Sequence, residues 1–269
     1  MQTKAKKSLG QNFLIDRNIQ RKIIDACKLA CEDIVLEIGP GRGELTNLIA
    51  RAGVKKLYAV ELDALLAQTL TKAFQDTSRV EIISGDILKV DLEKYFRGFK
   101  NLKVVGNIPY YITTPILERV VTRRDTIALA LFTVQKEFAR RIVATPGSKE
   151  YGSFSCFVRY YADARILFSI PRTCFRPMPK VDSCVLKLTP RYWRGAAPLN
   201  EKMLFRIIRS AFNQRRKTLR NSLKESLPPH ILGIFFETRH IGPNTRPEQI
   251  SLDDFITLTN LACNAGLKA

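Results

Sequence analysis

Short apolar runs alternate with amphipathic stretches over residues 1–189, and this alternation constrains the fold more than any other feature of the sequence. Such alternation is typical of βαβ units, whose strands form a mainly parallel sheet. The predicted strands are Val35–Ile38, Lys56–Glu61, Val80–Ser84, Lys103–Gly106, Ile127–Val134, Ala164–Ile170 and Val181–Leu188. The predicted helices are Ile19–Leu29, Glu44–Ala52, Leu62–Gln75, Pro115–Thr122 and Gln135–Ala144. The pattern therefore predicts an α/β domain with a mostly parallel sheet of seven strands.

The strand pattern stops near residue 190. Residues 190–200 contain Gly195 and Pro198 and are typical of a linker. Beyond them, Lys202–Leu227 and Ser251–Ala262 have helical patterns. We therefore predict two domains, an α/β domain of residues 1–189 and a small all-helical domain of residues 190–269.

A glycine-rich segment follows the first predicted strand and opens a helix. It reads Glu37-Ile-Gly39-Pro-Gly41-Arg-Gly43. Glycine lets the backbone turn sharply and approach a ligand where a Cβ would clash. A dinucleotide fingerprint needs its third glycine one residue later, where Glu44 stands, so a strict NAD-type site is disfavoured.

Carboxylates follow the next two predicted strands. Glu61 ends the second strand, 22 residues after Gly39, where an acid can accept hydrogen bonds from ribose hydroxyls. Asp86 follows the third strand and could accept from an adenine amino group. Either acid alone is more often solvated or a helix cap. Together with the glycines, at successive strand ends, they predict a pocket for a nucleoside cofactor, in which we also place Gly41 and Ile87.

The fourth predicted strand ends in Asn107-Ile108-Pro109-Tyr110, which favours a particular reaction type. The exocyclic amine of adenine is a poor nucleophile, so an enzyme must hold its hydrogens while an activated methyl group approaches. The Asn107 amide oxygen and the Ile108 backbone carbonyl could accept these hydrogens, and Pro109 would fix the turn. Tyr110 could stack on the base, a contact worth about 1–3 kcal/mol. The alternative reading of the tetrapeptide is a plain β-to-α turn.

A base must leave its stack before it reaches such a pocket, so a second aromatic wall is expected. Phe175 stands in an irregular segment between the last two predicted strands and is the candidate for this wall. Ordinary core packing is the competing interpretation for this ring.

The charge balance predicts a polyanionic partner. Lys and Arg number 44 against 25 Asp and Glu, a net charge of +19. Residues 206–224 contain seven basic residues and no acid. We predict that these seven contact RNA phosphates, although a solvated face explains many such charge runs. They are Arg206, Arg209, Arg215, Arg216, Lys217, Arg220 and Lys224.

Cysteine and histidine usage argues against a metal site. The six cysteines form no CxxC pair, and the two histidines, His230 and His240, lie far from most of them. Reduced thiols that fill core space are the expected reading. No secretory signal or membrane-length apolar run is visible, so we expect a cytoplasmic protein, and by default a monomer.

Several motifs together resemble the small-subunit ribosomal RNA adenine N6,N6-dimethyltransferases, the KsgA (RsmA) type. The similar segments are residues 6–16, 37–43, 85–86, 107–115, 175–183 and 211–223. The resemblance implies a Rossmann-like class I methyltransferase fold that uses S-adenosyl-L-methionine. It also implies that Asn12, Leu14, Gly39, Glu61, Asp86 and Asn107 contact this cofactor.

The resemblance implies a substrate as well: two adjacent adenines in the 3′-terminal hairpin of 16S rRNA, in a partly assembled (pre-30S) or 30S particle. A role in small-subunit biogenesis would follow. A large-subunit rRNA methyltransferase of the antibiotic-resistance type shares the catalytic motifs and remains an alternative. A non-enzymatic RNA-binding assembly or transcription factor on this fold, and a DNA or small-molecule N-methyltransferase, are the others.

Overall fold

The structure is a computed structural model that describes all residues except 1–5, 7–8, 193–196, 215 and 268–269. Two compact units divide the chain: residues 1–139 with 162–190, and residues 140–161 with 191–269. Each unit is described by itself. Among the described residues, no helix is long and apolar enough to cross a membrane.

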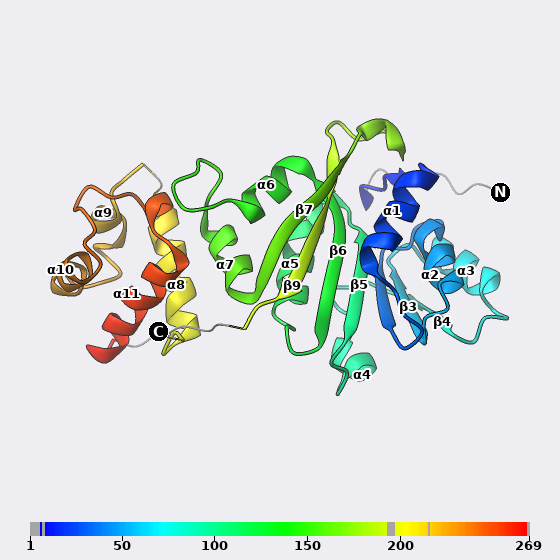
Figure 1. Ribbon diagram of the computed structural model, residues 1–269, viewed down its shortest axis with the longest axis horizontal. Helices are drawn as coiled ribbons and strands as arrows, with labels where there is room; N and C mark the ends of the chain where they lie inside the picture. The colour runs from blue at the N-terminus through cyan, green and yellow to red at the C-terminus, as the bar shows by residue number, and fades with distance from the viewer. Residues whose placement is uncertain (1–5, 7–8, 193–196, 215, 268–269) are drawn as a thin grey trace. The chain divides into compact units, whose positions relative to one another are not determined.

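A seven-stranded sheet organises the described part of the first unit, in the order β4-β3-β2-β5-β6-β9-β7 (Figure 1). Its strands are β2 (Ile34–Ile38), β3 (Lys56–Glu61), β4 (Val80–Ser84), β5 (Leu102–Asn107), β6 (Ile127–Gln135), β7 (Ala162–Ile170) and β9 (Ser183–Pro190). The first five strands of this order pair in parallel, whereas β9 pairs antiparallel with both β6 and β7. Parallel pairing brings the carboxyl ends of β2 to β5 to one edge of the sheet, where open α/β sheets bind ligands.

Helices cover the faces of this sheet, because each presents an apolar stripe to it. They are α1 (Arg17–Cys27), α2 (Glu44–Arg51), α3 (Ala64–Ala73), α4 (Leu92–Phe96) and α5 (Thr113–Val121), with α6 (Lys136–Val143) at the boundary between the units. Aspartates begin three of them: the side chains of Asp16, Asp63 and Asp91 accept hydrogen bonds from first-turn N–H groups of α1, α3 and α4. Short 3-10 segments span Tyr110–Ile112 and Arg172–Cys174.

One hydrophobic core joins α1 and α2 to the middle of the sheet. Ile23 and Cys27 of α1 and Ile49 of α2 are buried there with Val105 and Val185 of the strands. A short two-stranded sheet of β1 (Phe13–Leu14) and β8 (Phe175–Arg176) adds Leu14 and Phe175 to the same core. This small sheet ties the N-terminal segment to the last part of the first unit.

The second unit is helical and has an aromatic core of its own. Its helices are α7 (Ser153–Tyr161), α8 (Glu201–Phe212), α9 (Leu219–Leu223), α10 (Pro229–Thr238) and α11 (Leu252–Asn264), with a 3-10 turn at Pro247–Gln249. Phe212 of α8 packs against the rings of Tyr151 and Phe255, at centroid distances of 5.9 and 6.0 Å.

The predicted strands agree with the structure to within about two residues at most ends, and the mixed α/β fold is confirmed. The predicted helix Lys202–Leu227 is wrong, because the chain leaves the helix after Phe212 and begins α9 only at Leu219. Thr218 caps α9 with its side chain. Helices α7 and α10 were not predicted, and α7 belongs to a segment, residues 140–161, that the structure groups with the second unit.

Candidate active site

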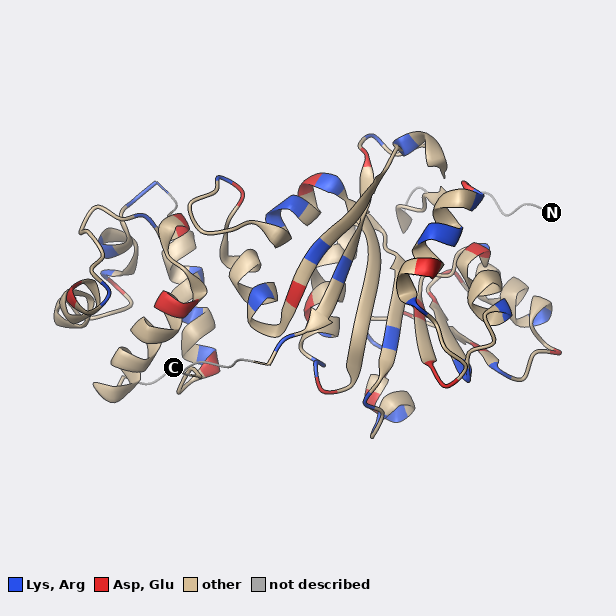
Figure 2. Ribbon diagram, in the orientation of Figure 1, with Lys and Arg blue, Asp and Glu red and all other residues tan. Residues whose placement is uncertain are grey.

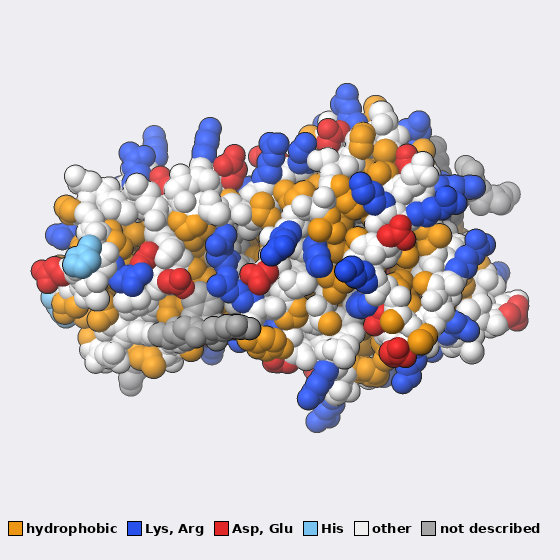
Figure 3. All heavy atoms as spheres, in the orientation of Figure 1, with side chains coloured by type: hydrophobic (Ala, Val, Ile, Leu, Met, Phe, Trp, Pro, Cys, Tyr) orange, Lys and Arg blue, Asp and Glu red, His pale blue; other side chains and the backbone are white. Residues whose placement is uncertain are grey.

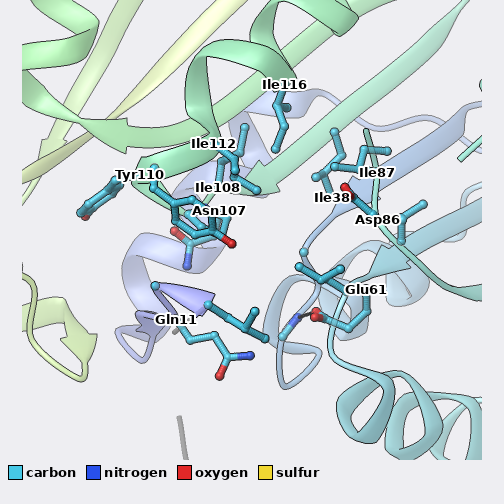
Figure 4. Close-up of a pocket in the computed structure, with 18 of the residues that line it drawn as sticks. Gln11, Ile38, Glu61, Asp86, Ile87, Asn107, Ile108, Tyr110, Ile112 and Ile116 are labelled. Atoms are coloured by element: carbon cyan, nitrogen blue, oxygen red, sulfur yellow. Dashed lines mark hydrogen bonds between the residues drawn. The ribbon is translucent and has the colours of Figure 1, made fainter. Parts of the chain in front are cut away.

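A pocket lies at the carboxyl edge of the parallel strands (Figure 4). It holds about 760 Å³ of space, part of it open to solvent. Its lining comes from the N-terminal segment, the glycine loop, the ends of β3, β4 and β5, and the start of α5. The lining residues that matter below are Asn12, Phe13, Gly39, Gly41, Glu61, Asp86, Ile87, Asn107, Ile108, Pro109, Tyr110, Tyr111 and Ile116.

The glycine loop passes directly beneath an aromatic ring. Gly41 has φ +60°, and a Cβ built on it would lie 3.0 Å from two atoms of the Phe13 ring. Only glycine fits both the left-handed backbone and this close approach. The Gly41 N–H donates to Glu61 Oε2 at 2.9 Å, which holds the loop against the end of β3.

Glu61 is fixed by backbone bonds to both of its oxygens. Besides the bond to Gly41, its Oε1 accepts from the Asp63 N–H at 2.8 Å. The side chain is buried, and burial raises the pKa of this carboxyl. Each carboxylate oxygen has a second lone pair, so Glu61 can still accept hydrogen bonds from a bound nucleoside.

Asp86 also lines the pocket and follows β4, the strand beside the one that ends in Glu61. Its Oδ1 accepts from the Leu88 N–H at 2.9 Å, whereas Oδ2 has no hydrogen-bond partner among the described residues. Ile87 follows it and is almost fully buried beside the pocket. One free carboxylate oxygen next to an apolar wall suits a flat base that carries an amino group.

Asn107 lies on the opposite side of the pocket from Glu61 and Asp86 (Figure 4). Its Nδ2 donates to the backbone carbonyl of Asn12 at 2.8 Å, and Oδ1 is left without a donor among the described residues. The amide is therefore turned so that its acceptor is available. Gly106 makes this position possible, because a Cβ there would lie 2.8 Å from the Ile38 carbonyl oxygen.

The residues after Asn107 form a stiff turn into α5. Thr113 Oγ1 lies within 3.3 Å of the carbonyl oxygens of both Pro109 and Tyr110 and bonds to them. The Tyr110 hydroxyl is 2.6 Å from Ser183 Oγ, which holds the ring in place, and burial raises the pKa of this phenol. Tyr111 also lines the pocket but is 58% exposed.

Comparisons with known proteins assign the chain to a family. Residues 2–263 match the family described as ribosomal RNA adenine dimethylase. The chain belongs to this family. It is an rRNA adenine dimethyltransferase that uses S-adenosyl-L-methionine as its methyl donor.

Relatives and solved structures agree with this assignment. The chain is 41% identical over 265 residues to the ribosomal RNA small subunit methyltransferase A of Geobacillus sp. (strain WCH70), covering 95% of this chain and 90% of the relative. It is 42% identical over 274 residues to the protein of that name from Pelotomaculum thermopropionicum, covering 97% and 92%. A dimethyladenosine transferase from Plasmodium falciparum superposes with a TM-score of 0.80 at 25% identity, covering 95% and 98%. The 23S rRNA methyltransferase ErmE shares the fold, with a TM-score of 0.69 at 24% identity over 93% and 99%.

The pocket of this dimethylase suits its cofactor on structural grounds. The close approach of Gly41 to Phe13, the carboxylate of Glu61 and the free oxygen of Asp86 offer separate partners for a sugar and a base. Apolar side chains of Ile38, Ile87, Ile108 and Ile116 also line the pocket. These acceptors, together with the apolar lining, fit a nucleoside whose hydroxyl and amino groups donate.

The N-terminal segment of the dimethylase forms one wall of the pocket, which sequence reasoning from the residues alone had missed. Lys6 Nζ lies 2.9 Å from the Asp63 carboxylate, and Gln11 Nε2 donates to the same group at 3.4 Å. These bonds lower the pKa of Asp63. The Arg42 guanidinium lies 4.4 Å from the centroid of the Phe13 ring. Only the family resemblance at residues 6–16 pointed to this segment.

Two predicted site residues lie elsewhere. Leu14 and Phe175 do not line the pocket, because they pair across β1 and β8 and bury their side chains in the core, at 3% and 0% exposure. The core-packing interpretation therefore describes Phe175 in this structure. The aromatic rings that line the pocket beside Tyr110 are those of Phe13 and Tyr111.

Glu37 precedes the glycine loop and is 1% exposed. Burial raises the pKa of its carboxyl from 4.5 to about 8, and the neighbouring acids Glu44 and Glu61 add to the effect. Its Oε2 has no hydrogen-bond partner among the described residues. Glu37 is therefore neutral over much of the physiological range in this structure.

The predicted RNA-contacting residues belong to the second unit and are largely exposed. Lys and Arg positions recur along α8 and α9 (Figure 2), and on the face drawn in Figure 3 Lys and Arg side chains are more widespread than acidic ones. Arg220 lies 5.4 Å from the centroid of the Phe236 ring, so it also packs on its own unit. The exposed predicted residues are Arg206, Arg209, Arg216, Lys217, Arg220 and Lys224, and Arg215 lies outside the described residues.

Proposed function

We propose that the chain dimethylates N6 of two adjacent adenines in the 3′-terminal hairpin of small-subunit rRNA. The substrate would be a pre-30S or 30S particle in the cytoplasm. The enzyme would act as a monomer. The names of the relatives and the basic second unit support this substrate. The single observation that carries the chemistry is the orientation of Asn107, whose Nδ2 is bound to Asn12 while Oδ1 is available.

In this proposal, Glu61 accepts hydrogen bonds from the ribose of the cofactor and Asp86 Oδ2 accepts from its adenine amine. Gly39 and Gly41 have no Cβ, so the rest of the cofactor can approach the backbone closely there. S-adenosyl-L-methionine supplies a methyl group activated by a sulfonium. These contacts would aim that group at the end of β5, beside Asn107.

Asn107 and Ile108 hold the target amine. Asn107 Oδ1 and the Ile108 carbonyl oxygen accept its two hydrogens, which draws the nitrogen lone pair out of conjugation with the ring and towards the methyl group. Tyr110 stacks on the base, and its bond to Ser183 keeps the ring in position. After the first transfer one hydrogen remains, so one acceptor suffices for the second methylation. The proton that the amine loses at each methylation would pass to water. Positioning supplies most of the effect, and no acid–base residue is required.

Asn107→Ala tests the proposal. Methyl transfer to undermethylated small subunits should be abolished, while affinity for S-adenosylhomocysteine, measured by calorimetry, stays close to wild type. Asn107→Asp is the matched variant, because it keeps an acceptor but cannot donate to the Asn12 carbonyl; it should retain more activity than alanine but less than wild type. Wild-type transfer by Asn107→Ala would contradict the role of this side chain.

Mapping of the modified adenines tests the substrate. Primer extension and mass spectrometry should find N6,N6-dimethyladenine in small-subunit rRNA and not in large-subunit rRNA, duplex DNA or free nucleosides. Modification of large-subunit rRNA would favour the antibiotic-resistance type of enzyme. Absence of transfer to any RNA, with RNA binding intact, would favour a non-enzymatic assembly factor.

A further inference from the structure

We propose that Arg119 of α5 is a positioning residue for the base of the cofactor, because it holds the loop that carries Asp86. The inference rests on the proposed function, in which Asp86 accepts from the adenine amine. Arg119 itself does not line the pocket, so it would act through the loop and through its charge, which interacts with that of Asp86.

The loop after β4 has no regular structure of its own to fix Asp86. Residues 86–90 form a turn in which the Asp86 carbonyl oxygen accepts from the N–H groups of Lys89 and Val90, at 2.8 and 2.9 Å. The Asp86 side chain adds the bond to the Leu88 N–H. All of these bonds lie within the turn and set its shape. Its start is attached to β3, because the Gly85 N–H donates to the Glu61 carbonyl oxygen at 2.8 Å, and Ile87 buries its side chain.

Arg119 attaches the later part of the turn, at Leu88 and Val90. Its Nη1 donates to the Leu88 carbonyl oxygen at 3.0 Å, and its Nη2 donates to the Val90 carbonyl oxygen. A guanidinium presents these donors in a rigid planar fork, so two bonds fix both the distance and the direction of the turn. The side chain is half-buried, which strengthens both bonds relative to water. A lysine ammonium is a point charge and cannot reproduce this geometry.

Helix α5 connects the hydrogen bonds of Arg119 to the turn that follows Asn107. It begins at Thr113, whose hydroxyl binds the carbonyls of Pro109 and Tyr110, and its Ile116 lines the pocket. Arg119 stands six residues after Thr113, about 9 Å along a rigid helix axis. The same element therefore holds the residues at both ends of the pocket, and their spacing decides whether the methyl group and the target amine align.

The experiment separates a positioning role from a general structural one. We would measure the binding of two ligands to the full chain by calorimetry: S-adenosylhomocysteine, and its analogue whose base is purine, without the 6-amino group. The wild type should prefer the adenine ligand, because only that ligand can donate to Asp86. Arg119→Gln should weaken the adenine ligand about tenfold, the expected effect of a lost charged hydrogen bond, and the purine ligand much less.

Two further variants complete the test. Arg119→Lys keeps the charge and should lose nearly as much preference as Arg119→Gln, and it also serves if the glutamine variant does not fold. Arg123→Gln is the matched control, because Arg123 lies one turn on, donates to the Arg119 carbonyl oxygen at 2.9 Å and makes no bond to residues 86–90 among the described contacts. Its ligand preference should stay at the wild-type value.

The outcomes distinguish this inference from the proposed function. An unchanged preference in both Arg119 variants, or an equal loss of both ligands, overturns the role of Arg119 alone. A wild type that binds both ligands equally overturns the assignment of Asp86 together with that of Arg119. Neither result bears on Asn107, which the methyl-transfer assay tests separately.

Discussion

Replacing Glu37 with glutamine should remove a pH dependence of stability that the wild-type chain carries. The Glu37 side chain is 1% exposed, and burial raises its pKa from 4.5 to about 8. The folded state therefore binds this proton more tightly than the unfolded chain does. The resulting stabilisation is fully present below pH 4.5 and is lost as the pH rises through about 8.

The size of the effect follows from the difference between the pKa of Glu37 in the folded and the unfolded chain. Each unit of pKa difference corresponds to about 1.4 kcal/mol, so a pKa raised from 4.5 to about 8 gives at most about 5 kcal/mol. Glutamine has nearly the same shape and is neutral at every pH. The free energy of unfolding of the variant should therefore equal that of the wild type near pH 4.5. Above pH 8 it should exceed the wild-type value by several kcal/mol.

Urea unfolding at a series of pH values measures this difference. The free energy of unfolding of wild type, Glu37→Gln and the control Glu118→Gln would be extrapolated to water at each pH. Glu118 is exposed on α5, so its variant should follow the wild type throughout. A difference between Glu37→Gln and wild type that stays constant across the interval would refute the reasoning.

Three further predictions concern the pocket and the basic second unit. Gly41→Ala should weaken S-adenosylhomocysteine binding about tenfold, because a left-handed alanine costs about 1–2 kcal/mol and its Cβ meets the Phe13 ring; calorimetry measures this, and wild-type affinity would contradict it. Lys6→Met should raise the KM for S-adenosylmethionine up to about fivefold, since its pair with Asp63 is half-exposed and such pairs contribute about 1 kcal/mol or less. The difference should shrink in high salt. Lys217→Gln should reduce the slope of log K against log salt for rRNA binding by about 0.9, and an unchanged slope would remove this residue from the phosphate contacts.

Much of the first unit could be predicted because its signals are local. A β-strand buried on both faces must be a short apolar run, and a tight loop must contain glycine, so β2 and the Gly39–Gly43 segment are visible in the sequence. Asn107 stands out for the same reason, because it follows a predicted strand and begins the segment Asn107-Ile108-Pro109-Tyr110. The break between α8 and α9 was missed because the basic and apolar spacing continues past Phe212, where α8 ends, to Leu219, where α9 begins.

Residue types and their order determined the strands of the first unit, the glycine loop and the polar residues at the strand ends, because each of these signals lies within a few residues of the chain. Contacts between distant segments decided the rest. The pairing of β1 with β8 buries Phe175 in the core instead of the pocket, and the bond from Asn107 to Asn12 joins residues 95 positions apart. The hydrogen bonds from Arg119 to the loop that carries Asp86 also join distant segments. Residue spacing cannot predict such contacts, because only the folded structure brings the two partners together.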